Sequence, residues 1–149
     1  MSQVASQVAT SEALILEVLT HLRSGQIGEA TARFAEEFRF TDHGIALEFK
    51  DKARLAEFFH KTRELYPDSL LLADRVFPSG DHVIVKWTYR ATITEPFFCG
   101  LSRKTPVSVE GVSIVRTREG EITDWTDYYD GLTSRRTALA AHFQEWVEL

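Results

Sequence analysis

The hydrophobic pattern of this 149-residue chain changes near residue 70 from mainly helical to mainly strand-like spacing, and this change limits the folds open to it. Before that point apolar residues recur every three or four positions, which is typical of helices with one buried face. After it, residues 83–93 alternate between apolar and polar side chains, and residues 107–117 form a second long run typical of a strand. Helices followed by a run of antiparallel strands predict an α+β fold.

Local signals place the ends of the predicted helices. Thr10 or Ser11 can cap the first helix, and Asp51 is a good cap for the third. The third helix is expected to end before Tyr66 and Pro67, because the residue before a proline avoids the helical conformation. The predicted helices span residues 11–24, 27–34 and 52–65.

Most of the predicted strands form one antiparallel meander. A short strand at residues 38–41 stands alone between the second and third helices, and the stretch 94–106 is irregular. Thr133 or Ser134 is expected to cap a last helix. The four strands of the meander are predicted at residues 70–77, 83–93, 107–117 and 122–130.

Length and composition favour one globular domain over residues 11–149, preceded by a polar, flexible segment at residues 1–10. The net charge of −5 is spread along the chain without a basic stripe, which argues against nucleic-acid binding. The chain shows neither a signal peptide nor an apolar run long enough to cross a bilayer. We therefore expect a cytoplasmic protein with no membrane contact.

Cysteine and histidine are too sparse for a disulfide framework or a metal site. Cys99 is the only cysteine, and it lies in the apolar stretch around Phe97 and Phe98, where a plain hydrophobic loop is the expected role. The five histidines are dispersed, and neither a phosphate-binding loop nor a nucleophile motif is present. We therefore expect no metal and no cofactor.

Residues 120–130 read Gly-Glu-Ile-Thr-Asp-Trp-Thr-Asp-Tyr-Tyr-Asp. A turn glycine, an isoleucine and then Trp-x-Asp-Tyr-aromatic-Asp resembles the final strand of SnoaL-like proteins of the nuclear transport factor 2-like superfamily, and of the similar limonene epoxide hydrolases. The order of elements, with Thr-Asp-His-Gly at 41–44 and Tyr-Pro-Asp at 66–68, extends the resemblance over nearly the whole chain.

The resemblance implies a curved, cone-shaped sheet with helices packed on its concave face and an apolar pocket inside. It also implies a homodimer formed through the outer face of the sheet. Such proteins include polyketide cyclases, ketosteroid isomerase, scytalone dehydratase and epoxide hydrolases, together with non-catalytic binding domains. The fold alone therefore does not decide the function.

Asp127 is the strongest acid/base candidate. Strand alternation places Trp125, Asp127 and Tyr129 on one face. The resemblance to the epoxide hydrolases puts that face in the pocket, with Asp127 matching a catalytic aspartate. A carboxyl between two aromatic side chains is easily desolvated, which perturbs its proton affinity. The alternative is a buried structural aspartate bonded to an arginine such as Arg90.

Asp42 and His43 are the other two catalytic candidates. The resemblance to ketosteroid isomerase-like proteins gives Asp42 the place of a general base, whereas its position before Gly44 is also typical of a turn-forming aspartate. His43 follows directly, and strict alternation would place only one of the two side chains in the pocket. A surface role for His43 is the alternative.

The predicted binding residues come from the two central strands. Trp87 and Tyr89 share one face and would line the pocket with Trp125 and Tyr129 if that face is concave. Arg90 and Glu110 are charged residues in the middle of apolar strands. Their spacing allows a cross-strand pair, either in the pocket or on a dimer face.

The sequence departs from both parent mechanisms. The hydrolases carry Arg-x-Asp where this chain has Trp87-Thr88-Tyr89-Arg90, and the residues that match the oxyanion-hole groups of the isomerase are Val18 and Gly111 or Val112. We therefore expect a cofactor-free cyclase, isomerase or hydrolase that acts by acid/base chemistry on a small hydrophobic oxygenated molecule. The alternative is a non-catalytic ligand-binding or dimeric interaction module of the same fold.

Overall fold

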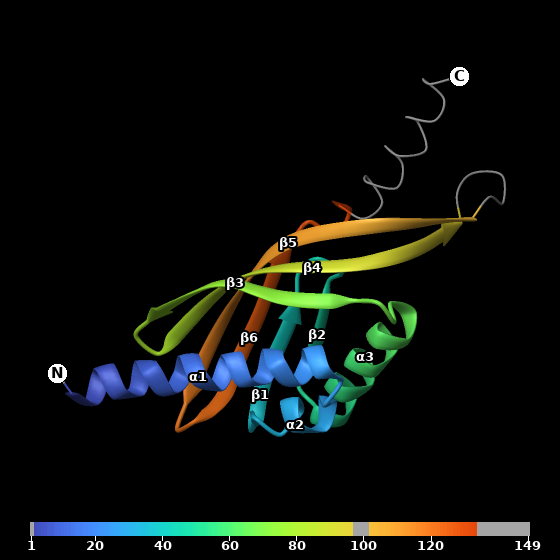
Figure 1. Cartoon of the computed structure of the whole chain (residues 1–149). Coiled ribbons are helices and arrows are strands. Elements are labelled where there is room, and N and C mark those ends of the chain that lie inside the picture. Colours follow the sequence, from blue (N-terminus) through green and yellow to red (C-terminus); the bar gives the residue numbers. More distant parts are fainter. Residues whose placement is uncertain (1, 97–101, 134–149) are drawn as a thin grey trace.

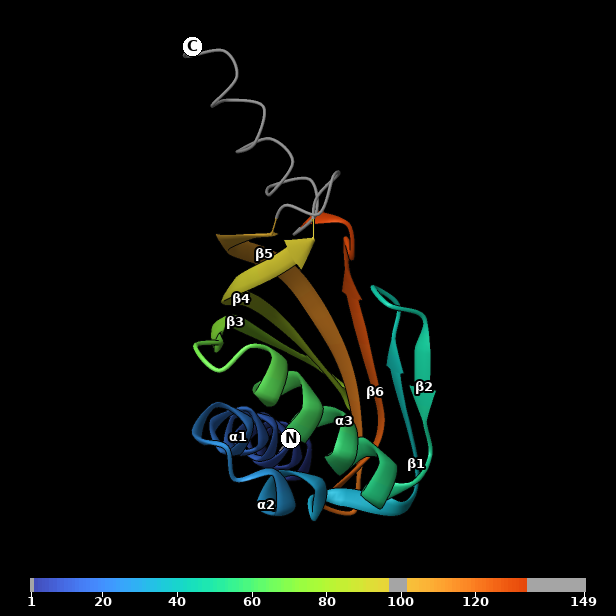
Figure 2. The ribbon, with the colours of Figure 1, turned by 90° about the vertical axis from the view of Figure 1, so that its right-hand side faces the viewer.

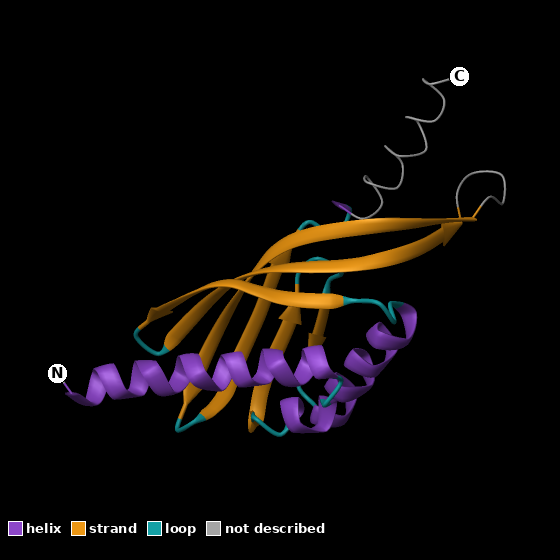
Figure 3. Ribbon diagram, viewed as in Figure 1, coloured by secondary structure: helices purple, strands orange, loops and turns teal. Residues whose placement is uncertain are grey.

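The computed structural model describes residues 2–96 and 102–133, in which three helices lie against one side of a six-stranded sheet (Figure 1). Figure 3 shows the helices gathered on one side of the sheet. Along the chain all three helices precede β3 to β6, as the change of period predicts. The elements are α1 (Ser2–Ser24), α2 (Ile27–Thr31), β1 (Phe34–Asp42), β2 (Leu47–Phe49), α3 (Lys52–Leu65), β3 (Leu70–Ser79), β4 (His82–Pro96), β5 (Ser102–Arg118) and β6 (Glu121–Tyr129).

The sheet has the strand order β2-β1-β6-β5-β4-β3. Strands β3 to β6 form the predicted antiparallel meander. Strand β1 lies beside β6 and runs parallel to it, while β2 pairs antiparallel with the outer edge of β1. The parallel pair joins an early segment of the chain to the last strand of the sheet.

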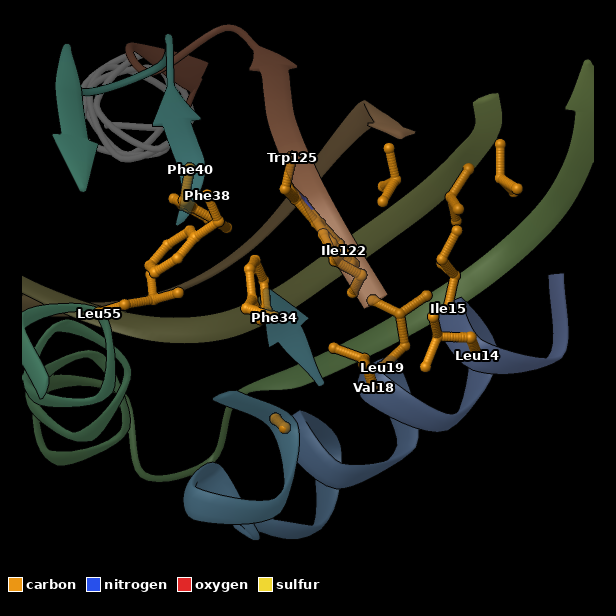
Figure 4. Close-up of a cluster of buried hydrophobic side chains, with 14 of the residues drawn as sticks. Leu14, Ile15, Val18, Leu19, Phe34, Phe38, Phe40, Leu55, Ile122 and Trp125 are labelled. Carbon is orange, nitrogen blue, oxygen red and sulfur yellow. The ribbon is translucent and has the colours of Figure 1, made fainter. Parts of the chain in front are cut away.

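The sheet curves around the helices, and the side view shows α1, α2 and α3 within its concave side (Figure 2). Apolar residues of α1, α3 and the inner faces of the strands form one core there (Figure 4). The side chains of Ile15, Leu55, Val85, Val115 and Ile122 are completely buried. The alternation of the strands thus fixes one inner face along the whole sheet.

Phe40 is the centre of an aromatic cluster that joins β1 to α3. Its ring lies 5.6 Å from that of Phe59, in an edge-to-face arrangement, and 6.3 Å from the rings of Phe58 and Phe49. On the other side it stacks on Trp125 of β6 at 6.3 Å. Such ring pairs stabilise a fold beyond the area that they bury, so the cluster holds β1 and β6 in register beneath α3.

Two helical predictions were wrong at their boundaries. Helix α1 begins at Ser2 and not at a Thr10 or Ser11 cap, because the alanines and glutamines before Ser11 are compatible with a helix. Phe34 belongs to β1 and not to the second helix. It pairs with Ile122 of β6, so tertiary pairing decides its conformation.

The strand predictions were incomplete. Strand β2 was not predicted, and β4 and β5 extend through most of the stretch expected to be irregular. The two central strands are therefore longer than the segments 83–93 and 107–117 predicted from the sequence pattern. The predicted Phe97–Cys99 loop and all but the start of the last helix lie outside the described residues.

Within the described residues, every helix is too short or too polar to pass through a lipid bilayer.

Substituting Leu55 tests the packing of α3. Leu55 is completely buried, whereas Leu65 on the same helix is 71% exposed. We expect L55A to lower the free energy of unfolding by about 2–5 kcal/mol, because it leaves a cavity in the core. The matched control L65A should change it by less than about 0.5 kcal/mol. Chemical denaturation measures both, and equal losses would contradict the packing described.

Candidate functional site

Two carboxyl groups meet on the concave face at the parallel pair of strands. Asp42 at the end of β1 lies directly opposite Asp127 of β6 in the register. The backbone N–H of His43 donates to the carbonyl oxygen of Asp127 over 3.0 Å, which fixes this register at the end of β1. The structure thus brings together the two aspartates singled out in the sequence.

Asp127 is held through one of its two carboxyl oxygens. The hydroxyl of Ser113 donates to Oδ1 over 2.5 Å, and the indole N–H of Trp125 donates to the same atom over 2.7 Å. No described residue donates a hydrogen bond to Oδ2. One oxygen therefore orients the side chain and the other is available for chemistry.

The surroundings of Asp127 favour its neutral form. The pKa of this carboxyl is raised to about 7: desolvation by burial is the main cause and the charge of Asp42 adds to it, while the hydrogen bonds from Ser113 and Trp125 oppose the rise. The residue as a whole is partly buried.

Asp42 is buried more deeply, with 5% of its surface exposed. The hydroxyl of Tyr129 donates to its Oδ2 over 3.1 Å, and the backbone N–H of Ile45 donates to its Oδ1 over 3.2 Å. Burial raises the pKa of Asp42, and these two hydrogen bonds oppose the rise. Asp42 therefore forms the predicted turn and also faces the site.

Tyr129 connects Asp42 to the aromatic wall of the site. Burial and the nearby carboxyl of Asp42 raise the pKa of its hydroxyl far above the usual range, so the hydroxyl keeps its proton and acts as a donor. The ring lies edge-to-face against Trp87 at 5.6 Å. Trp87, Trp125 and Tyr129 thus surround the aspartates on the concave face.

Tyr89 also lies on the concave face, where it packs against the core next to Trp87. Its hydroxyl is buried and makes no hydrogen bond with the described residues. Burial raises the pKa of this hydroxyl; Ser69 offsets part of the rise but does not reach hydrogen-bonding geometry. All four predicted aromatic residues therefore lie on the same face as the aspartates.

His43 does not join the site. Its exposed ring stacks on that of Tyr128 with centroids 4.6 Å apart, on the outer face of the sheet. Strand alternation places the side chain of Asp42 inside and that of His43 outside. The structure therefore corrects the prediction that the His43 side chain enters the pocket beside Asp42.

Arg90 and Glu110 also lie on the outer face and are exposed, so they do not line the concave site. Glu110 forms an ion pair with Lys86, with 3.5 Å between the charged atoms, in place of the expected pair with Arg90. The alternative of an Asp127–Arg90 pair is likewise not observed, because Asp127 bonds Ser113 and Trp125. Of the two positions predicted for Arg90 and Glu110, the structure thus excludes the pocket, because strand alternation turns both side chains to the outer face.

Ser113 is the site residue that the sequence analysis missed. It occupies an inward position of β5, opposite Asp127 in the register, and accepts a hydrogen bond from the indole of Trp87 over 2.8 Å. The signal in the sequence was weak: one small hydroxyl in a row of inward residues that includes Val109, Gly111 and Val115. Its function depends on a neighbouring strand, which periodicity alone does not identify.

Neither a metal-binding cluster nor a surface groove among the described residues contains the aspartate pair. Among residues 2–96 and 102–133, no three His, Cys, Asp or Glu side chains are grouped to hold a metal ion. A groove of about 670 Å³ includes Arg39, Arg116 and Asp124, and another of about 550 Å³ includes Asp68 and Arg90. Neither groove includes Asp42 or Asp127, so the aspartate pair is identified by its chemistry and not by the size of a hollow.

The family model of the SnoaL-like domain matches residues 15–125. This chain belongs to the SnoaL-like family. The match ends two residues before Asp127, so the aspartate pair is assigned here from geometry. A comparison with curated protein sequences finds no match.

Solved structures of SnoaL-like and related proteins share the fold. A putative SnoaL-like polyketide cyclase from Shewanella denitrificans has 14% identity and a TM-score of 0.74, covering 87% of this chain and 97% of its own. A hypothetical protein from Catenulispora acidiphila with a ketosteroid isomerase-like fold, in complex with trimethylamine, has 19% identity and a TM-score of 0.72, covering 83% of this chain and 90% of its own. AclR, a putative hydroxylase from Streptomyces galilaeus, has 18% identity and a TM-score of 0.69, covering 85% and 83%. The predicted cone-shaped α+β fold is confirmed.

The raised pKa of Asp127 predicts how stability depends on pH. Its folded-state pKa of about 7 lies above the unfolded value of about 4, so the stabilisation from the bound proton is present below about pH 4 and is lost as the pH rises through 7. The D127N variant cannot ionise. We expect it to exceed the wild type in unfolding free energy by on the order of 4 kcal/mol at pH 8, with a smaller excess at pH 5, and to approach the wild type only near pH 4.

Thermal unfolding across this pH range measures the difference between the two proteins. The control is D124N on the outer face of the same strand, which should show no such trend with pH. A constant difference between D127N and the wild type from pH 5 to pH 8 would contradict the raised pKa of Asp127.

Proposed function

We propose that this SnoaL-like protein is an enzyme that moves a proton on a small, hydrophobic, oxygen-containing molecule, with Asp127 as the acid/base group. One observation carries the proposal: Asp127 lies opposite Asp42 on the concave face, is held through Oδ1 alone by the described residues, and has a pKa raised by burial to about 7. General acid/base catalysis is most efficient when the pKa of the group lies near the working pH. At neutral pH Asp127 is present in both protonation states and can take up a proton and return it.

The reaction step that fits this group is proton transfer beside a carbonyl. The Asp127 carboxylate removes a proton from the carbon next to the carbonyl group, and the electron pair of the C–H bond shifts towards the carbonyl oxygen. The protonated carboxyl then returns its proton to the substrate. Cyclisation and isomerisation can both begin with such a step, and a protonated carboxyl can also assist a hydrolysis.

Asp42 supports this role electrostatically. Its charge raises the pKa of Asp127, while the Tyr129 hydroxyl donates to Asp42 and stabilises its ionised form. Different hydrogen-bond partners thus distinguish two carboxyls that lie side by side. Asp127 is the carboxyl whose second oxygen is not engaged by described residues, so we assign the proton transfer to it.

The walls of the site support a hydrophobic substrate. The rings of Trp87, Trp125 and Tyr129 surround the aspartates, and the described inner face of the neighbouring strands is mainly apolar. Such walls exclude water and bind apolar surface, while the carboxyls orient a polar group. A carbonyl or hydroxyl on an apolar carbon skeleton matches both features.

Hydrogen–deuterium exchange of hydrophobic ketones tests the proposal. We expect the wild-type protein to accelerate exchange of the α-hydrogens of a ketone such as 2-tetralone in D₂O, with a rate that rises with pH through about 7 as Asp127 ionises. D127N should lower this rate by about 100-fold or more, since a positioned base contributes about that factor. NMR of the ketone follows the exchange.

D124N is again the matched control, since Asp124 lies on the opposite face of β6, and it should exchange the ketone like the wild type. Equal rates for D127N and the wild type would contradict the assignment. Tight binding of the ketone by the wild type with no exchange at any pH would favour a ligand-binding module instead.

A further inference from the structure

Ser113 forms the centre of a three-residue hydrogen-bond chain across three strands. The indole N–H of Trp87 on β4 donates to Ser113 Oγ over 2.8 Å, and the Ser113 hydroxyl donates to Asp127 Oδ1 over 2.5 Å. Ser113 is 1% exposed, so bulk water does not compete for these bonds. The chain links a core tryptophan to the acid/base carboxyl.

The chemistry of the three groups fixes the direction of this chain. An indole N–H can only donate, so Ser113 Oγ must accept from Trp87. The single hydroxyl proton of Ser113 then points to Asp127, whatever the protonation state of the carboxyl. Oδ1 receives this bond together with the bond from Trp125, which occupies both of its acceptor directions.

Trp87 can reach Ser113 because the intervening inward position is a glycine. A Cβ atom added at Gly111 would lie 2.3 Å from ring carbons of Trp87. Any larger residue at this position would therefore displace the indole and break its contact with Ser113. The close approach of Gly111 and Trp87 is thus part of the arrangement that orients the serine.

We infer that Ser113 is a positioning residue which, together with Trp87, holds Asp127 so that Oδ2 is the atom that exchanges a proton. This inference rests on the proposed acid/base role of Asp127. When Asp127 is neutral its proton lies on Oδ2, because Oδ1 is saturated by donors. The same atom carries the free lone pairs when Asp127 is ionised, so one atom performs both half-reactions.

Indole N–H signals in NMR spectra test this inference without a substrate. The chain has three tryptophans, and W87F and W125F assign the two relevant signals. In the wild type we expect the Trp125 and Trp87 signals to shift with pH at one common midpoint near 7, because both sense Asp127. In S113A the Trp125 midpoint should rise by about one unit or more, and the Trp87 signal should cease to titrate.

The matched control is T117V, which removes another buried hydroxyl from the inner face of β5. Thr117 bonds Ser11 over 2.7 Å and not Asp127, so both indole signals should titrate as in the wild type. S113T, which keeps the hydroxyl, should restore the wild-type midpoint. If S113A does not fold, W87F provides the second variant, with a smaller upward shift of the Trp125 midpoint.

An unchanged Trp125 midpoint in S113A, or in W87F if S113A does not fold, would overturn the inference. Equal shifts in S113A and T117V would also overturn it, because they would indicate general loosening of the strand. The inference would also be overturned if, in the wild type, the indole signals of Trp87 and Trp125 shifted with different pH midpoints. The NMR titration involves no turnover. It can therefore support or overturn the positioning role of Ser113 even if the ketone exchange assay fails and the proposed function is wrong.

Discussion

The parallel pairing of β1 with β6 is the constraint on which the site depends. It places Asp42 opposite Asp127, although the two residues are far apart in the sequence. The aromatic cluster around Phe40 holds the two strands in this register and packs them beneath α3. A shift by one residue would turn either carboxyl to the outer face, where His43 lies.

Burying two carboxyls side by side is unfavourable unless their charge is reduced. The structure meets this requirement with unequal partners. Asp42 receives hydrogen bonds from Tyr129 and Ile45, whereas Asp127 receives two donors on a single oxygen and keeps a pKa of about 7. The same electrostatic cost that lowers stability at alkaline pH supplies a group able to exchange protons at neutral pH.

The features that depend on local periodicity could be predicted from the sequence. The features that depend on pairing between distant segments of the chain could not. The alternation of residues 83–93 and 122–130 gave the meander and the inward faces of Trp87 and Asp127. The parallel position of β1, the strand conformation of Phe34 and the role of Ser113 follow from contacts across strands. His43 was misplaced because it was kept as a candidate beside Asp42, although strand alternation turns neighbouring side chains to opposite faces.

The titration of the Asp127 carboxyl in the wild-type protein tests the central claim most directly. Carbon-13 labelling of the aspartates, with D127N to assign the signal, gives the midpoint by NMR. The electrostatic balance described here predicts a midpoint near pH 7. A midpoint near the ordinary value of about 4 would show that the site does not perturb Asp127, and the acid/base role would then lose its physical basis.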